Sequence, residues 1–80
     1  MTSTRAGSYI LGTAMLISLN GADHELPAGA TVADLLRELQ LTTARVAVER
    51  NKRIVSSPDR RSERLSEGDE LEIVTFVGGG

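Results

Sequence analysis

The stretch that decides the fold is Glu70–Gly80, with the sequence ELEIVTFVGGG. Its first eight residues alternate between two faces, as a β-strand requires: Leu71, Ile73, Thr75 and Val77 on one, Glu72, Val74 and Phe76 on the other. Three glycines lose much freedom on ordering and add nothing to a fold. We therefore predict a final strand over Glu70–Val77 and a flexible tail over residues 78–80 that reaches about 10 Å beyond it.

Such a tail is thin enough to enter a slot that excludes side chains, and it carries a carboxylate at its tip. The alternative is an end without function, because chain termini are commonly disordered.

A helix is predicted to begin at Thr31 and to pack on this strand. Thr31 and Asp34 have the spacing of a capping box, with aspartate in place of the usual Glu or Gln. Apolar residues then recur with helical spacing and form one apolar face: Val32, Leu35, Leu36 and Leu39.

Four shorter strands are predicted, over residues 15–19, 22–26, 46–50 and 53–55. Asn20-Gly21 is a strong hairpin signal between the first two, and Asn51-Lys52 turns the chain between the other two. A hairpin, a helix, two strands and a final strand fit an α+β sheet with one helix on one face. The first and last strands then lie parallel and central, and the other sheet face stays uncovered.

Val74 and Phe76 fall on that uncovered face, immediately before the tail. We predict that they form a partner-docking surface. The alternative places Phe76 over a sheet edge, since single exposed apolar residues are common. For the polar segments we favour solvated surface over a binding site: the loop from Ser56, its arginines Arg60, Arg61 and Arg64, and the lone His24.

The composition excludes several classes of function. Eighty residues make one small domain, which we place at residues 15–77, after an N-terminal extension over residues 1–14 that is rich in loop formers. The absence of cysteine and the single histidine exclude thiolate chemistry and a histidine metal cluster. A net charge of −2 gives no electrostatic footprint for nucleic acid, and no apolar run is long enough to span a membrane. We expect no catalytic residues and no metal site.

With this order of elements and this tail, the chain resembles ubiquitin-like β-grasp proteins. More narrowly, it resembles the sulfur-carrier proteins of thiamin (thiazole) biosynthesis, the ThiS family. The matching blocks are Ile17–Gly21, Thr31–Leu36, Val48–Lys52 with Ile54-Val55, Glu67–Asp69 and Glu72–Gly80. The extension before Met15 and the third glycine depart from the family pattern. The related carriers of molybdopterin synthesis usually approach the tail through prolines, which Thr75–Val77 lacks.

The resemblance implies a mixed sheet of four to five strands and a cytoplasmic carrier protein rather than an enzyme. It implies that an E1-like adenylating enzyme uses ATP to activate Gly80, while Gly78 and Gly79 thread into the partner. A sulfur donor such as a cysteine desulfurase system then leaves a thiocarboxylate, which thiazole synthase consumes. The chain itself binds no cofactor in this scheme.

Three alternatives stay open on the sequence. They are a sulfur carrier for molybdopterin synthesis, a ubiquitin-like protein modifier, and a non-covalent β-grasp interaction module.

Overall fold

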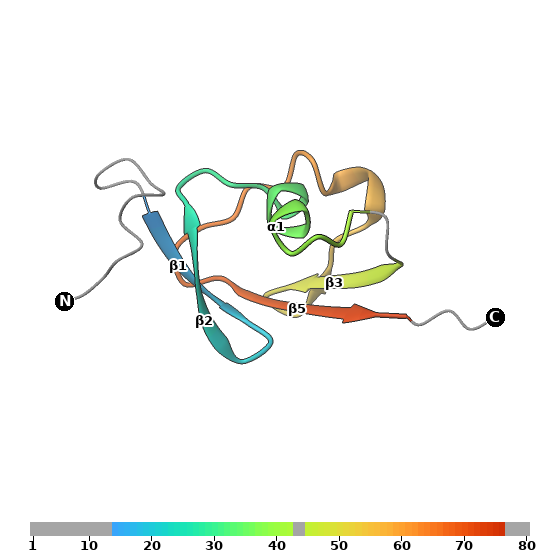
Figure 1. Cartoon of the computed structure of the whole chain (residues 1–80), viewed down its shortest axis with the longest axis horizontal. Coiled ribbons are helices and arrows are strands. Elements are labelled where there is room, and N and C mark those ends of the chain that lie inside the picture. Colours follow the sequence, from blue (N-terminus) through green and yellow to red (C-terminus); the bar gives the residue numbers. More distant parts are fainter. Residues whose placement is uncertain (1–13, 43–44, 77–80) are drawn as a thin grey trace.

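The structure is a computed structural model that describes residues 14–42 and 45–76. Its elements are β1 (Ala14–Leu19), β2 (Ala22–Pro27), α1 (Val32–Glu38), β3 (Val46–Arg50), β4 (Arg53–Ile54), the 3₁₀ helix η2 (Ser57–Asp59) and β5 (Glu70–Thr75). The five strands form one mixed sheet in the order β2-β1-β5-β3-β4, with α1 on one side (Figure 1). The predicted α+β sheet with a single covering helix is confirmed.

Strand β5 is central because β1 pairs with it in parallel on one side and β3 pairs antiparallel on the other. The β1–β2 hairpin turns at Asn20 and Gly21, whose φ angles of 51° and 86° lie in the left-handed region that a type I′ turn requires. Strand β1 begins at Ala14, which pairs with Pro27, one residue before the expected start. The rest of the predicted extension, residues 1–13, lies outside the described residues.

Helix α1 begins with the predicted capping box. The Thr31 hydroxyl accepts a hydrogen bond from the Asp34 amide at 3.1 Å, and the Asp34 carboxylate accepts one from the Thr31 amide at 2.9 Å. The hydrogen bond from the Thr31 amide and a second one from Arg37 lower the pKa of Asp34. The charged cap thus favours the first turn of the helix.

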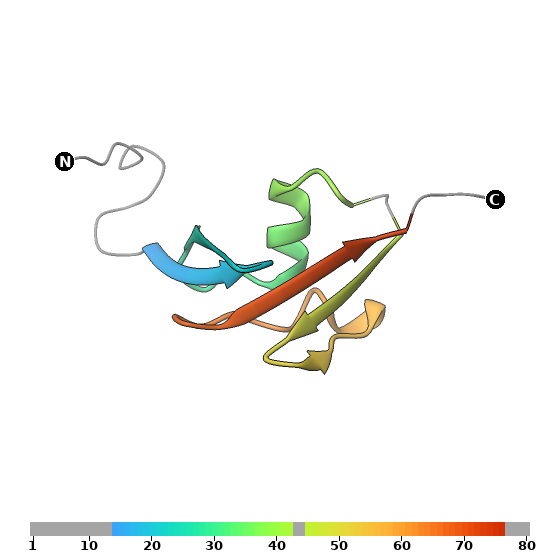
Figure 2. The same ribbon diagram turned by 90° about the horizontal axis from the view of Figure 1, so that it is seen from below.

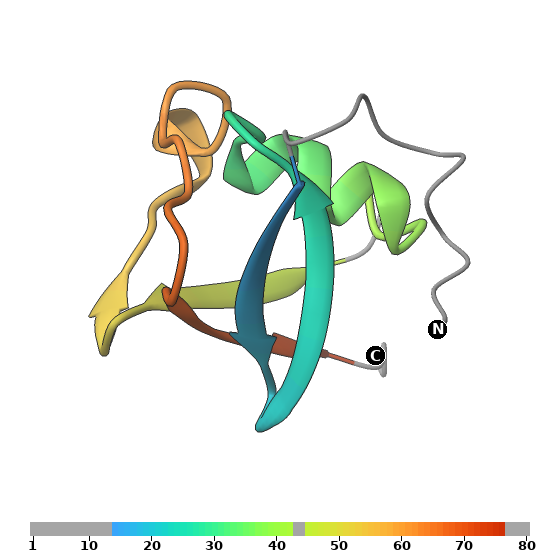
Figure 3. The ribbon, with the colours of Figure 1, turned by 90° about the vertical axis from the view of Figure 1, so that its left-hand side faces the viewer.

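The core fills the space between α1 and the concave side of a strongly twisted sheet. Figure 3 shows the β1–β2 hairpin crossing β3 and β5 steeply, with α1 on the concave side. The buried apolar residues come from β1, β2, β3 and β5, from the helix and from the loops: Met15, Ile17, Leu26, Ala30, Val32, Leu35, Leu36, Val48, Val55, Leu65, Leu71 and Ile73. Three of the four predicted helix positions are therefore buried, and Leu39 packs half-buried beside them.

Two predicted segments differ in detail from the structure. Strand β4 holds only Arg53 and Ile54, although Val55 continues its register: the Val55 amide donates to the Val48 carbonyl at 2.9 Å, and its side chain is buried in the core. The predicted loop after Ser56 contains the 3₁₀ turn η2, which has Pro58 in its first turn.

Candidate functional site

The last residues of β5 alternate as predicted. Leu71 and Ile73 are buried against the helix side, whereas the side chains of Val74 and Phe76 on the opposite face are each 56% exposed. Both the docking surface and the alternative, in which Phe76 folds back over a sheet edge, stay predictions. Val77 and the predicted tail residues Gly78, Gly79 and Gly80 lie outside the described residues, so their roles stay predictions.

The open sheet face carries more apolar surface than these two residues. Ala47 lies opposite Val74 across the β3–β5 ladder. Ile54, 69% exposed, lies opposite Glu49 on the adjacent strand pair. We define the open-face patch as Phe76, Val74, Ala47 and Ile54.

Sequence reasoning missed Ile54 as a member of this patch. The signal was present, because a two-residue turn at Asn51-Lys52 fixes the hairpin register and puts Ile54 on the same face as Glu49.

A polar rim flanks the open-face patch at both ends of β5. Glu72 lies directly opposite Glu49, which in turn lies opposite Ile54, so this acidic pair shares a cross-strand row with one member of the patch. At the other end, Phe76 lines a shallow hollow with four residues from β3 and the η2 segment: Arg45, Val46, Ser57 and Arg60. The patch thus has acidic groups toward the start of β5 and basic groups beside its exit.

Arg60 corrects the expectation that all three arginines of the η2 loop are solvated. Its guanidinium is half-buried, and Nη2 donates to the Val46 carbonyl at 3.0 Å. Arg60 therefore ties the loop to β3 near the end of β5. Arg61 and Arg64 are exposed, as predicted.

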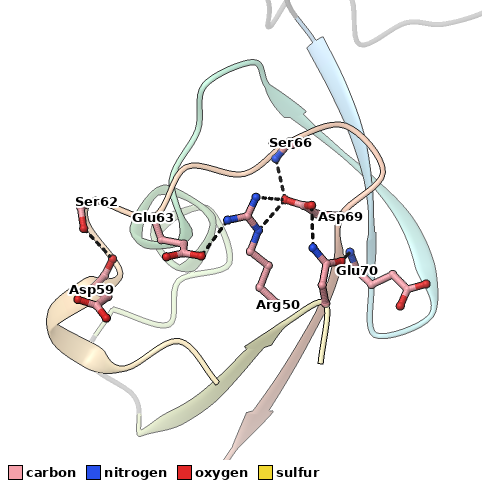
Figure 4. Close-up of polar contacts among 8 residues, drawn as sticks. Arg50, Asp59, Ser62, Glu63, Ser66, Asp69 and Glu70 are labelled. Carbon is pink, nitrogen blue, oxygen red and sulfur yellow. Dashed lines mark hydrogen bonds and ion pairs between the residues drawn. The ribbon is translucent and has the colours of Figure 1, made fainter. Parts of the chain in front are cut away.

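The start of β5 is fixed by a polar clasp centred on Asp69 (Figure 4). The Asp69 carboxylate accepts hydrogen bonds from Arg50 Nε at 2.8 Å, from Asn51 Nδ2 at 3.0 Å and from the Ser66 amide at 2.7 Å. Arg50 Nη1 also donates to Glu63 at 2.8 Å. We call these five residues the Asp69 clasp; they join the end of β3 and the turn after it to the loop that leads into β5.

The clasp sets the charge states of its members. Burial acts to raise the pKa of Asp69, but the hydrogen bonds from Asn51, Ser66 and Arg50 outweigh it and hold that pKa below its usual value. The hydrogen bond to Glu63 raises the pKa of Arg50, against the opposing effect of burial. At neutral pH Asp69 is therefore an anion paired with the Arg50 cation.

Two turn asparagines also grip β5 from opposite sides. The Asn20 side chain accepts from the Ile73 amide at 2.8 Å and donates to the Ile73 carbonyl at 3.2 Å. The Asn51 side chain accepts from the Glu70 amide at 2.9 Å. Both asparagines have positive φ angles, so each turn aims its side chain back at the central strand.

The described residues contain no group of three or more His, Cys, Asp and Glu side chains that could hold a metal ion. The predicted lone histidine is part-buried rather than fully solvated, and His24 Nε2 lies 3.5 Å from Glu38 Oε1 on α1. Among the helices described here, none is long and apolar enough to cross a membrane.

Comparison with known proteins places this geometry in context. The sequence profile of the ThiS family matches residues 14–80. The sulfur carrier protein ThiS of Bacillus subtilis (strain 168) is 41% identical over 66 residues, which cover 81% of this chain and 100% of that protein. The crystal structure of the thiamine biosynthesis protein (ThiS) from Geobacter metallireducens superposes with a TM-score of 0.66 at 30% identity, covering 82% of this chain and 100% of that one.

A second kind of relative is longer than this chain. The thiazole synthase of Magnetococcus marinus is 46% identical over 66 residues, which cover 82% of this chain but 20% of that protein. The thiazole synthase of Paramagnetospirillum magneticum is 42% identical with the same coverage. The chain thus spans about a fifth of the length of these two relatives.

Proposed function

This chain belongs to the ThiS family, with a β-grasp fold, and from that premise we propose that it carries sulfur for the thiazole ring of thiamin. The observation that carries the proposal is the extent of the family match, which spans residues 14–80 and includes all three glycines. The match to a sulfur carrier over that protein's whole length supports the same function.

The chemistry begins at the carboxylate of Gly80. A terminal carboxyl group has a pKa of about 3.5, so at neutral pH it is an anion without a leaving group and a poor electrophile. An E1-like adenylating enzyme joins this carboxylate to the α-phosphate of ATP and releases pyrophosphate. Hydrosulfide, released when a thiol reduces the persulfide of an external donor such as a cysteine desulfurase system, then displaces AMP and leaves a thiocarboxylate.

The thiocarboxylate is consumed by thiazole synthase, which takes the sulfur and regenerates the carboxylate. The chain acts as a carrier and co-substrate in this cycle, and ATP is bound by the adenylating partner. Gly78 and Gly79 lead Gly80 into the partner because they present no Cβ to a narrow channel.

The geometry supports a carrier that is held by its body while its tail reacts elsewhere. The Asp69 clasp fixes the start of β5, and the open-face patch exposes Val74 and Phe76 just before the tail. A partner that grips the tail must contact the body there, so we propose Phe76 and Val74 as docking residues.

The proposal is tested by the intact mass of the protein purified from its own cell. We expect a fraction of the chain to end at Gly80 and to carry the mass increase of one oxygen-to-sulfur exchange. The matched control is a variant with one alanine appended after Gly80, which should show no exchange. If the appended variant showed the same mass increase, activation would not require Gly80 as the terminal residue.

A further inference from the structure

The backbone of β5 offers a second interaction surface, distinct from the open-face patch. In an antiparallel pair, alternate residues bond to the partner strand, and the residues between them direct their N–H and C=O groups the other way. The Phe76 amide donates to the Arg45 carbonyl at 2.9 Å, and the Asn51 amide donates to the Glu70 carbonyl at 2.8 Å. Even-numbered residues of β5 therefore bond to β3, and Leu71, Ile73 and Thr75 face the β1 side.

The β1 side of β5 is filled only as far as Ile73. The parallel register ends with Leu19 opposite Leu71, whose carbonyl accepts from the Asn20 amide at 2.8 Å. The Asn20 side chain then occupies both the N–H and the C=O of Ile73, in place of a further strand residue. Beyond this point β5 continues past the tip of β1, and among the described segments only β3 lies alongside it (Figure 2).

Thr75 is consequently the first residue of β5 with an open edge. Thr75 lies opposite Val46 in the β3–β5 ladder. Because the even-numbered residues of β5 bond to β3, the N–H and C=O of Thr75 point away from β3. Within residues 14–42 and 45–76, no group hydrogen-bonds to these two backbone atoms. Thr75 is also exposed, so another chain can approach it.

We propose that this edge is completed by an extended segment of the adenylating partner, which adds to the sheet as a strand beside Thr75. The inference rests on the proposed function, because that function requires a partner to hold the chain beside its tail. Two features favour this occupant. The open edge lies on the strand that leads to the tail, and it begins where the Asn20 side chain stops. Strand addition also recognises backbone rather than side chains.

Amide hydrogen exchange measured by NMR on the full chain tests the proposal without any substitution. In the free protein we expect the Thr75 amide to exchange much faster than the Val74 and Phe76 amides, which face β3. Addition of the purified adenylating enzyme from the same genome should slow the Thr75 amide to the rate of its neighbours. A Thr75 amide that stays unprotected in a saturated complex would overturn the proposal.

A pair of substitutions at the same residue provides an independent test. Thr75→Pro removes the edge N–H but no bond to β3, since proline is tolerated where a strand N–H faces solvent. Thr75→Val keeps the N–H. We expect Thr75→Pro to melt near the wild-type temperature and to bind the adenylating enzyme about tenfold more weakly, with Thr75→Val unchanged. Equal binding by both variants would contradict strand addition.

The outcomes separate this inference from the proposed function. If the wild-type chain is neither bound nor adenylated, the proposed function fails. If it is adenylated while Thr75 remains unprotected, only the edge proposal fails. If protection of Thr75 rises with the concentration of the chain alone, the occupant is a second copy, which also overturns the proposal.

Discussion

The start of β5 is bonded to β1 through Ser18 and to the turn after β3 through Asn51, whereas its end, within the part of the chain that the structure describes, has a neighbour on the β3 side only. Around Glu70, the Asn51 side chain of the clasp accepts from the Glu70 amide, and farther along the strand the Asn20 side chain holds Ile73. At Phe76, the hydrogen bond within the described residues is the one from its amide to the Arg45 carbonyl, and more than half of the aromatic residue is exposed. The difference indicates that the start of this strand is held in place, whereas its end is accessible to a partner. Four predictions test the contrast, in order of decreasing effect.

Removal of Gly79 and Gly80 gives the largest expected effect on activity and the smallest on folding. Glycine has no side chain to pack in a core, whereas the carboxylate of Gly80 is the proposed substrate. We expect the truncated chain to keep its melting temperature and to lose ATP-dependent activation entirely. The measurements are a thermal melt and pyrophosphate release with the adenylating enzyme.

If the truncated chain is still adenylated, the adenylating enzyme does not require the carboxylate of Gly80. A truncated chain that unfolds would show that the tail belongs to the fold.

Substitution on the covered face tests the opposite property. Leu36 lies on α1 in the core, so Leu36→Ala leaves a cavity and should destabilise the fold by about 2–5 kcal/mol. The exposed Val74 provides the matched control, and Val74→Ala should change stability by less than about 0.5 kcal/mol. Urea denaturation of the two variants measures the difference. Equal losses would mean that the two sheet faces are not distinct in energy.

Much of this fold could be predicted because its signals are local. The Thr31–Asp34 capping box, the Asn20-Gly21 turn and the alternation over residues 71–76 each depend on neighbouring residues, and each is confirmed. The parallel placement of the first and last strands followed from the order of elements alone, and the sheet has it.

The remaining features depend on residues far apart in the sequence. Asp69 and Arg50 are 19 residues apart, and Asn20 and Ile73 are 53 apart. No periodicity links such pairs, so the Asp69 clasp and the two asparagine contacts were not foreseen. Arg60 was predicted to be solvated because its acceptor is the backbone carbonyl of Val46, and no pattern of side chains in the sequence reveals a backbone acceptor.

The third prediction removes the charge of Asp69 at the start of β5. Asp69→Asn keeps the side-chain shape but removes the charge that Arg50 pairs with, so we expect a loss of about 1–3 kcal/mol in stability at pH 7. Asp23 is an exposed carboxylate on β2, and Asp23→Asn should fall within about 0.5 kcal/mol of wild type. If both substitutions cost the same, the start of β5 is not held by the clasp.

The pH dependence of the same pair sharpens this result. Because the folded-state pKa of Asp69 is lowered, its contribution is fully present above the ordinary aspartate pKa of about 3.9. It is lost as the pH falls through the lower folded-state value. The stability difference between wild type and Asp69→Asn should therefore shrink when denaturation is repeated at progressively lower pH. A difference that is constant across this range would assign the effect to shape rather than charge.

The last prediction concerns the exposed end of β5. Phe76 is the single phenylalanine of the chain, and it lies beside the basic residues Arg45 and Arg60 at the point where the tail begins. Aromatic residues at the centre of an interface carry much of its binding energy. Phe76→Ala should therefore weaken binding to the adenylating enzyme by about 1–3 kcal/mol. Val74→Ala should act in the same direction with a smaller effect, since valine has less area to bury.

The same substitutions should leave folding almost unchanged, because the side chains of Phe76 and Val74 are already more than half exposed in the free chain. Leu16 supplies the control: it is 42% exposed, and its carbonyl accepts from the Gly68 amide, which places it at the opposite end of β5 from the tail. Leu16→Ala should bind like wild type in the same titration. If Phe76→Ala instead melts far lower and binds with unchanged affinity, Phe76 serves the fold. A loss of binding in Leu16→Ala equal to that in Phe76→Ala would spread the docking surface over the whole sheet face and remove the distinction between the two ends of β5.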